Sequence, residues 1–173
     1  AVAPTGAGKT YIALLMMKHV LESDPNKKVV FVVHKIPLVI QQAKALQELL
    51  PHPFNQKVGM FYSDRSMNGW DYLLNMYDVM VCTVQLLLNA LENSRSCLSS
   101  IQLLVIDECH HAKANHPYRT LMKKYYFPAK RAGKPVPRIL GLSASPAAHN
   151  TTAETLLAIL QLCHDLDCKI RKV

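Results

Sequence analysis

Residues 3–10, Ala-Pro-Thr-Gly-Ala-Gly-Lys-Thr, constrain this chain more than any other stretch. They have the spacing of a phosphate-binding loop, in which glycines permit a tight turn and bring backbone N–H groups close to an anion. A helix predicted to begin near Lys9 adds the positive end of its dipole, Lys9 would reach the terminal phosphates, and the Thr10 hydroxyl would bind Mg²⁺. The alternative is an ordinary glycine-containing turn before a helix. The predicted phosphate-loop contacts are Pro4, Thr5, Gly6, Ala7, Gly8, Lys9 and Thr10.

The 173 residues suffice for one domain, predicted to span residues 1–173, and half of them are hydrophobic. No apolar run has the length of a membrane span, and the five cysteines lack paired metal-ligand spacing, which favours reduced thiols in an intracellular protein of the cytoplasm or nucleus. The net charge of +8 indicates a polyanionic partner, nucleic acid first, or simply a basic soluble domain.

A phosphate loop normally follows a buried strand, but only Ala1 and Val2 precede this one. We therefore expect a truncated first strand and a longer parent protein.

Hydrophobic periodicity predicts an alternating series of helices and strands. The predicted helices cover residues 11–22, 37–50, 85–92, 118–126 and 152–164. The predicted strands cover residues 28–34, 57–63, 78–83, 101–107 and 138–144, and a basic, proline-bearing loop is predicted at 130–138. Strands that alternate with helices in this way predict an α/β fold, with a parallel sheet covered by helices on both faces.

Two acids, Asp107 and Glu108, directly follow an apolar run that ends at residue 106. Ligands bind at the carboxyl ends of the strands in parallel sheets. Asp107 is therefore expected to hold the Mg²⁺ that bridges the phosphates, and Glu108 to orient and deprotonate the attacking water, so that Lys9, Asp107 and Glu108 are the predicted catalytic residues. The alternative is that both acids cap the next helix. The cysteine and histidines that follow have no second ligand cluster, which argues against zinc.

These motifs occur in the order known from one group of proteins. The loop at 3–10, the Asp-Glu-Cys-His box at 107–110 and the Ser-Ala-Ser at 143–145 resemble motifs I, II and III of superfamily-two helicases. The DECH spelling with Gly-Leu-Ser-Ala-Ser-Pro resembles the RNA-stimulated ATPases that include the RIG-I-like receptors and the helicase region of Dicer ribonucleases. Residues 34–42, 70–71 and 107–118 favour Dicer. The resemblance implies a RecA-like P-loop NTPase domain, the first of two such lobes.

The same resemblance implies contacts with nucleic acid. Residues 35–42 match motif Ia, and Thr-Val-Gln at 83–85 matches a motif usually written Thr-Ala-Gln; in relatives both contact the nucleic-acid backbone. The residues implied are Lys35, Pro37, Gln41, Thr83 and Gln85. Ser143 and Ser145 match the motif that couples hydrolysis to strand movement. The alternatives are a solvated lysine and turn hydroxyls that are satisfied locally.

The resemblance implies the ATP- and Mg²⁺-dependent first lobe of a helicase or translocase that acts on double-stranded RNA, within a Dicer-like endoribonuclease. The alternatives are a RIG-I-like RNA-sensing receptor, a DNA-translocating superfamily-two helicase and a catalytically silent nucleic-acid-binding module. The DECH spelling disfavours the DNA-translocating relatives, which usually carry DEAH, and the intact catalytic residues disfavour the silent module. The second lobe of the same chain would supply an arginine finger, so this fragment alone is expected to be inactive, and no membrane partner is expected. A weaker candidate for RNA contact is the basic stretch Lys123, Lys124, Lys130, Arg131 and Lys134.

Overall fold

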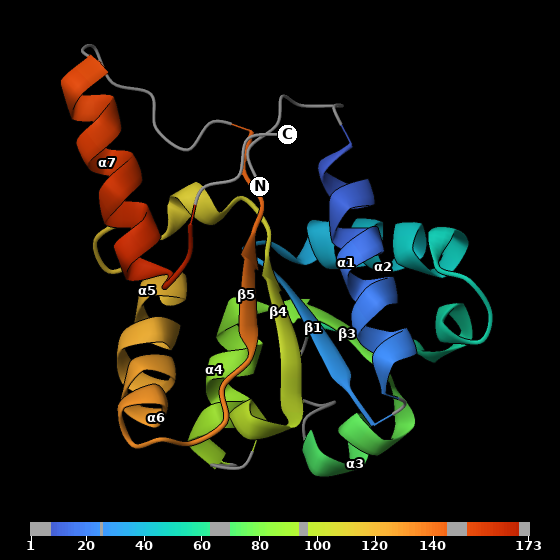
Figure 1. Cartoon of the computed structure of the whole chain (residues 1–173). Helices are drawn as coiled ribbons and strands as arrows, with labels where there is room; N and C mark the ends of the chain where they lie inside the picture. The colour runs from blue at the N-terminus through green and yellow to red at the C-terminus, as the bar shows by residue number, and fades with distance from the viewer. Residues whose placement is uncertain (1–7, 25, 63–69, 94–96, 145–151, 170–173) are drawn as a thin grey trace.

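Five parallel strands form one sheet at the centre of the computed structural model, which describes residues 8–24, 26–62, 70–93, 97–144 and 152–169. The strands are β1 (Lys28–Val33), β2 (Val58–Phe61), β3 (Val79–Thr83), β4 (Ile101–Ile106) and β5 (Arg138–Gly141). Their order across the sheet is β2-β3-β1-β4-β5 (Figure 1). The parallel sheet predicted from the alternating sequence pattern is confirmed.

Side chains of the central strands alternate between two hydrophobic clusters, one on each face of the sheet. In β1, Val29, Phe31 and Val33 belong to one cluster. Val30 and Val32 belong to the other, and all five side chains are fully buried. Because a strand covered on both faces has no polar side, this arrangement explains why the central strands are uninterrupted apolar runs.

Helices cover both faces of the sheet, as predicted. On one face lie α1 (Lys9–Ser23) and α2 (Ile36–Leu49). On the other lie α3 (Trp70–Met76), α4 (Val84–Asn93), α5 (Pro117–Leu121) and α7 (Thr152–Asp165). Short 3-10 turns occur at η1 (Phe54–Lys57), η3 (Cys97–Ser100) and η4 (Cys109–His111). In the part of the chain that the structure describes, no helix is both long and apolar enough to cross a membrane.

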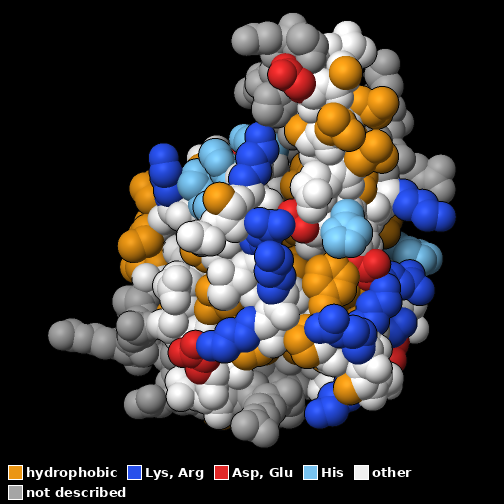
Figure 2. Space-filling model, turned by 90° about the vertical axis from the view of Figure 1, so that its left-hand side faces the viewer, with side chains coloured by type: hydrophobic (Ala, Val, Ile, Leu, Met, Phe, Trp, Pro, Cys, Tyr) orange, Lys and Arg blue, Asp and Glu red, His pale blue; other side chains and the backbone are white. Residues whose placement is uncertain are grey.

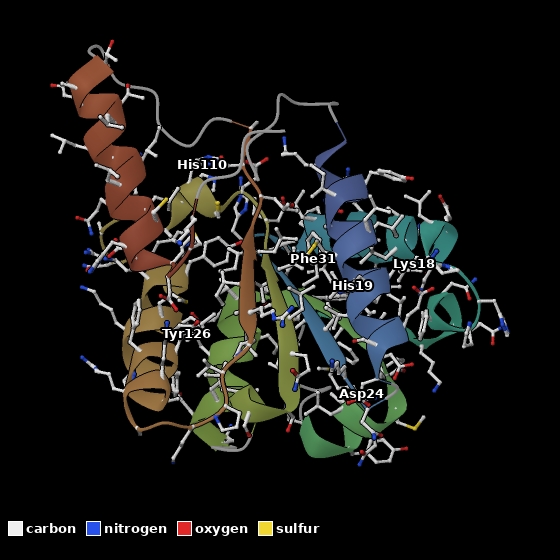
Figure 3. All side chains as sticks on the ribbon, in the orientation of Figure 1. Lys18, His19, Asp24, Phe31, His110 and Tyr126 are labelled. Atoms are coloured by element: carbon white, nitrogen blue, oxygen red, sulfur yellow. The ribbon has the colours of Figure 1, made fainter. Side chains whose placement is uncertain are left out.

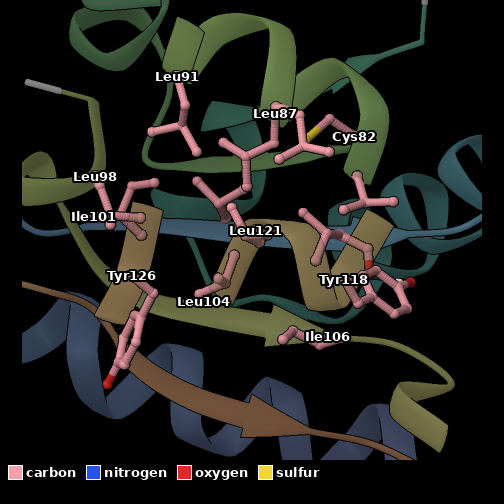
Figure 4. Packing of buried hydrophobic residues seen from close by; sticks show 14 of the residues in the cluster. Cys82, Leu87, Leu91, Leu98, Ile101, Leu104, Ile106, Tyr118, Leu121 and Tyr126 are labelled. Carbon is pink, nitrogen blue, oxygen red and sulfur yellow. Dashed lines mark hydrogen bonds between the residues drawn. The ribbon is translucent and has the colours of Figure 1, made fainter. Parts of the chain in front are cut away.

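The larger cluster joins the sheet to α4 and α5 (Figure 4). Leu104 and Ile106 of β4 face Leu87 of α4 and Leu121 of α5 there, and Tyr118 closes the cluster at the carboxyl end of the strand. Ile106 directly precedes the acids that follow β4, and the Tyr118 hydroxyl donates to the Asp107 carbonyl. The burial of β4 therefore fixes where its carboxyl end, and hence Asp107, lies.

The helix predicted at 118–126 is longer and less regular than expected. α5 continues into a π-helical turn, η5 (Met122–Tyr126), and then into α6 (Phe127–Arg131). The Phe127 N–H donates to the Met122 carbonyl, five residues back, immediately before Pro128, which has no N–H to continue an α-helix. The predicted basic loop at 130–138 is therefore wrong at its start, because Lys130 and Arg131 are helical.

Two other predictions need correction. β5 ends at Gly141 rather than at residue 144, although Leu142 still bonds to the neighbouring segment: its N–H donates to the Ile106 carbonyl at 2.9 Å, and its carbonyl accepts from the Cys109 N–H at 2.8 Å. Helix α3 was not predicted at all. Its Trp70 is 3% exposed and packs into the larger cluster, so a short amphipathic turn forms through tertiary contact.

Candidate functional site

The register of the strands brings the candidate residues to one edge of the sheet. Val33 of β1 is opposite Thr83, the last residue of β3, and Val32 is opposite Ile106, the last residue of β4. The segments that follow these strands therefore leave the sheet side by side, with Asp107 among them. Helix α1 begins at the same edge and runs back across the sheet (Figure 1).

The start of α1 has the geometry expected after a phosphate loop. Gly8 is the N-cap, and its φ of 80° lies in the left-handed region that glycine adopts without strain. The Ile12 N–H donates to the Gly8 carbonyl at 3.0 Å, so helical bonding begins there. Lys9 and Thr10 are partly buried in a first turn that carries no acidic side chain. The remaining predicted loop residues, Pro4, Thr5, Gly6 and Ala7, lie outside the described residues.

Asp107 is a carboxylate that is only 7% exposed. Its N–H donates to the Val32 carbonyl at 3.0 Å, Oδ1 accepts from the Glu108 N–H at 3.0 Å, and Oδ2 accepts from Gln42 Nε2 at 3.3 Å. Burial, and then the charge of Glu108, raise the pKa of Asp107, whereas its hydrogen bonds and the positive charge of Lys9 lower it. A buried carboxylate held in this way is stabilised by a nearby cation.

Two residues that contact Asp107 were not selected from the sequence. Tyr118 is fully buried, and its hydroxyl donates to the Asp107 carbonyl at 2.9 Å and lies 3.4 Å from the Val32 carbonyl. On α2 it is Gln42 that reaches the acid, whereas the predicted Gln41 is exposed. The helical period of the sequence could have identified Gln42, because this residue borders the buried stripe of α2 and therefore faces the sheet.

Glu108 has a strained backbone. Its φ of 45° and ψ of 48° lie in the left-handed region, which costs a non-glycine residue about 1–3 kcal/mol and is enriched at functional sites. Its side chain makes no capping hydrogen bond to η4, which argues against the helix-cap alternative. Its Oε2 instead lies 3.2 Å from His110 Nδ1, and the carboxylate is 29% exposed. The turn therefore presents a partly solvated carboxylate next to the buried Asp107.

His110 joins this turn to the segment after β5. Its Nδ1 lies 2.9 Å from the Oγ of Ser143, which is only 1% exposed. Burial and the charge of His111 lower the pKa of His110, and the charge of Glu108 opposes them. Figure 3 places His110 beyond the carboxyl ends of the strands, where its ring can exchange hydrogen bonds with both Ser143 and Glu108. Ser145, the other predicted coupling residue, lies outside the described residues.

The histidine rings near the DECH box contact one another at tilted angles. The ring centroids of His34 and His111 are 4.7 Å apart, and those of His110 and His111 are 4.3 Å apart. Over the described ranges, no group of three or more His, Cys, Asp or Glu side chains is arranged to hold a metal ion. Mg²⁺ needs no such group, because it commonly takes one or two carboxylates together with water and substrate phosphates. The single buried carboxylate of Asp107 fits that requirement.

The predicted motif Ia residues lie at this edge but on its outer surface. Lys35 follows β1 and is the N-cap residue of α2, with Pro37 in the first turn of the helix. Lys35, Pro37 and Gln41 are all exposed. Their exposure leaves them accessible to a large ligand at the edge that also holds Asp107.

The predicted residues at the end of β3 and the start of α4 have local partners. The Leu86 N–H donates to Thr83 Oγ1 at 3.4 Å, so Thr83 caps the start of α4. Gln85 is exposed, and its Nε2 donates to Asn89 Oδ1 at 3.0 Å. A local partner supports the turn-hydroxyl alternative for Thr83, yet its position opposite Val33 places it at the edge of the sheet from which Lys35 follows β1.

The basic stretch lies elsewhere. α6, which carries Lys130, lies toward the amino ends of the strands in Figure 1, away from Asp107. Lys124 is 2.7 Å from Glu92, and Lys130 is paired with Asp167. Lys and Arg side chains are spread over the face in Figure 2, with acidic groups among them. This stretch is separate from the candidate edge.

A family model described as the res subunit of type III restriction enzymes, ResIII, matches residues 1–148. The chain belongs to the ResIII family. The match includes the phosphate loop, the DECH box and residues 143–145. Membership of this helicase ATPase family implies the use of a nucleotide and a metal ion.

Individual relatives indicate to which group of ResIII proteins this domain is similar. It is 36% identical over 172 residues to the Endoribonuclease Dicer homolog 2 of Arabidopsis thaliana, covering 94% of this chain and 12% of that protein. It is 39% identical over 155 residues to the Dicer-like protein 1 of Phaeosphaeria nodorum, covering 84% of this chain and 10% of that protein. It is 34% identical over 171 residues to the ATP-dependent RNA helicase DHX58 of Mus musculus, covering 95% of this chain and 25% of that protein.

The fold has a solved counterpart in the Hef helicase domain of Pyrococcus furiosus. The TM-score is 0.78 at 28% sequence identity, over 98% of this chain and 33% of that chain. The predicted RecA-like fold and the predicted membership of the Dicer and RIG-I-like helicase group are confirmed. The ResIII domain spans only 12% of the Arabidopsis relative, so the activity, substrates and partners of a whole protein are proposals.

Proposed function

We propose that this ResIII domain binds ATP at the edge formed by the start of α1 and the end of β4 and contributes the catalytic acids for its hydrolysis. The observation that carries the proposal is the pair of acids after β4. Asp107 is buried, which raises its pKa, and the positive charge of Lys9 acts in the opposite direction. Glu108 beside it is partly exposed and has a strained backbone. Lys9 and the loop that ends at Gly8 would bind the phosphates, as the left-handed Gly8 and the acid-free first turn of α1 favour.

A Mg²⁺ ion fits this edge. Asp107 has a buried carboxylate of raised pKa, and we assign it with the Thr10 hydroxyl to hold the ion. The ion would supply charge neutralisation for the phosphates. Gln42 and Tyr118 would then act as positioning residues, Gln42 by fixing the carboxylate and Tyr118 by fixing the backbone of Asp107.

Glu108 is assigned as the general base. Its carboxylate would orient the attacking water and accept its proton, and its partial exposure allows water to reach it. His110 contacts both Glu108 and Ser143. These contacts support a path by which a change in the protonation or position of Glu108 alters the hydrogen bonding of Ser143. We assign Ser143 and Ser145 to this coupling role.

We further propose that the active site is completed by a second RecA-like lobe of the same protein, and that the domain alone hydrolyses ATP poorly. An arginine finger supplied by such a lobe contributes about 10³–10⁵ in rate. The share of the relatives that this domain covers, from 10% to 25%, is consistent with further domains. The whole protein would act inside the cell, in the cytoplasm or nucleus.

The proposed nucleic-acid partner is double-stranded RNA. Lys35, Pro37 and Gln41 would contact its backbone at the edge of the sheet, together with Thr83 at the end of β3 and Gln85 at the start of α4. The similarity to two Dicer-type proteins favours a Dicer-like endoribonuclease as the parent. The similarity to DHX58, which is named an ATP-dependent RNA helicase, favours a RIG-I-like receptor as the second candidate.

Replacing Gln42 with alanine is expected to raise the Mg²⁺ concentration needed for half-maximal ATP hydrolysis by about tenfold, because a hydrogen bond to an ionised carboxylate contributes on the order of 1.5–3 kcal/mol. Lys44→Ala, exposed on the same helix, is the control. A Mg²⁺ titration of the ATPase rate decides the matter, and an unchanged midpoint in Gln42→Ala would remove Gln42 from the site.

Binding of double-stranded RNA should weaken steeply with salt and should not depend on RNA sequence, because A-form RNA is contacted through phosphates and 2′-hydroxyls. Lys35→Ala is expected to reduce the slope of log affinity against log salt by about one. Lys27→Ala is the control, since Lys27 precedes β1 at the opposite end of the sheet. Fluorescence anisotropy over a salt series measures the slope, and equal slopes for Lys35→Ala and the wild type would exclude Lys35 from the interface.

A further inference from the structure

Helix α7 ends in a turn that brings two cysteines together. The Cys168 N–H donates to the Cys163 carbonyl at 3.0 Å, and the Asp167 N–H donates to the His164 carbonyl at 3.3 Å. Asp167 has a φ of 50°, in the left-handed region. These features define a Schellman motif, in which the third-last helical residue and the second residue beyond the cap have side chains in contact. Here those two residues are Cys163 and Cys168.

The two thiols are close and accessible. They share a hydrogen bond, and both side chains are only partly buried. Cys82 and Cys109, in contrast, are buried in the core, and burial raises the pKa of each to about 12. Cys163 and Cys168 also line a cavity of about 420 Å³ together with Phe127, His164, Asp167 and Lys169. A small reagent can therefore reach this pair without unfolding the domain.

The turn is held in place by the rest of the domain. The Asp167 carboxylate accepts a hydrogen bond from the Tyr126 hydroxyl at 2.8 Å and is paired with Lys130. Leu166, between the helix and the turn, is fully buried. Because Leu166 and Asp167 anchor the turn between the two cysteines, their sulfur atoms are held near each other and no long loop has to close. This pre-organisation favours a cross-link between them over reaction with separate partners.

We propose that Cys163 and Cys168 form a reversible disulfide by exchange with a small-molecule disulfide such as oxidised glutathione. The Cys163 thiolate attacks one glutathione sulfur and releases one glutathione thiolate, leaving a mixed disulfide. Cys168 loses its proton to solvent and attacks the Cys163 sulfur, which releases the second glutathione and closes the protein disulfide. Two protein thiols are oxidised and one glutathione disulfide is reduced to two thiols, so atoms and electrons balance.

The order of attack follows from the surroundings. Burial, together with Cys163, raises the pKa of Cys168 to about 11, so Cys168 keeps its proton at neutral pH and acts second. The bond would tie the last turn of α7 to the segment that contacts η5 and α6 through Asp167. In a reducing compartment, such exposed intracellular disulfides are transient and respond to the redox state.

The test is peptide mapping by mass spectrometry after incubation of the whole protein with oxidised glutathione, followed by alkylation. We expect a 163–168 cross-link lacking two hydrogen atoms, a fall of about tenfold or more in alkylation of both thiols, and full reversal by a dithiol reductant. Cys168→Ser should retain a glutathione adduct on Cys163, whereas Cys163→Ser should form little adduct, because burial keeps Cys168 protonated. Stable glutathione adducts on both thiols of the wild type, a cross-link to Cys109 instead, or unchanged alkylation would each overturn the proposal.

A second pair of variants tests whether disulfide closure depends on the backbone conformation of the turn or only on the nearness of the two cysteines. Asp167→Gly keeps a residue that adopts a positive φ, and should close the disulfide at close to the wild-type rate. Asp167→Val forces a β-branched residue into that conformation and should slow closure by about tenfold. Both variants lose the contacts of the carboxylate, so the comparison isolates the backbone. Equal closure rates in the two variants would contradict the assigned role of the Schellman turn.

Discussion

Glu108→Gln is expected to lower the rate constant of ATP hydrolysis by about 10²–10⁴-fold while leaving the affinity for ATP and Mg²⁺ nearly unchanged. The amide has almost the same shape as the carboxylate, so the strained turn and the contact with His110 can persist. What the amide lacks is the ability to accept the proton of the attacking water. Binding of a fluorescent ATP analogue and single-turnover hydrolysis, measured on the same protein, separate the two effects.

The control for this prediction is Glu92→Gln. Glu92 is an exposed acid on α4 that pairs with Lys124, and it lies in the same domain but away from the edge. Its replacement should leave both binding and turnover unchanged. Parallel losses of binding and turnover in Glu108→Gln would make Glu108 a metal ligand or a structural residue, and wild-type turnover would remove it from the mechanism.

Lys9→Ala is expected to reduce kcat/KM for ATP by about 10²–10³-fold, since it removes a positive charge aimed at the position where phosphate charge develops. The melting temperature should change little, because Lys9 is a partly exposed residue in the first turn of α1. Lys9→Arg should also be impaired, because the planar guanidinium does not reproduce the compact ammonium group.

The matched control is Lys18→Ala, on the same helix. Lys18 is half-exposed and lies 3.7 Å from Glu22, a surface pair that contributes little to stability. Steady-state kinetics of the variants, at the same protein and Mg²⁺ concentrations, give the ratio directly. If Lys9→Ala turned over ATP as fast as Lys18→Ala, the loop at 3–10 would not be the phosphate site.

The sequence predicted the sheet and the acidic edge because both depend on local patterns. The apolar runs at 28–33 and 101–106 can be satisfied only by strands covered on both faces, so their ends and the position of Asp107 follow. The start of α1 at Lys9 also matched, since Gly8 supplies the left-handed N-cap that the loop requires. These features need no knowledge of distant contacts.

What the sequence did not predict arises from contacts between distant segments. The contact of Tyr118 with the Asp107 carbonyl depends on how α5 packs over β4, and the choice of Gln42 over Gln41 depends on the rotation of α2 on the sheet. The positive φ of Glu108 is imposed by the turn between β4 and η4, which no propensity favours for this residue. The π-helical turn before Pro128 depends on how α5 and α6 pack.

The central claim is that this edge hydrolyses ATP when RNA engages the protein. Its most direct test is the ATPase rate of the whole protein without nucleic acid, with double-stranded RNA and with double-stranded DNA, at one salt concentration. We expect RNA to raise the rate by about tenfold or more, because it would bring the second lobe and its arginine finger against Lys9 and Glu108, and we expect DNA to raise it much less. A rate indifferent to RNA, or stimulated only by DNA, would contradict the account.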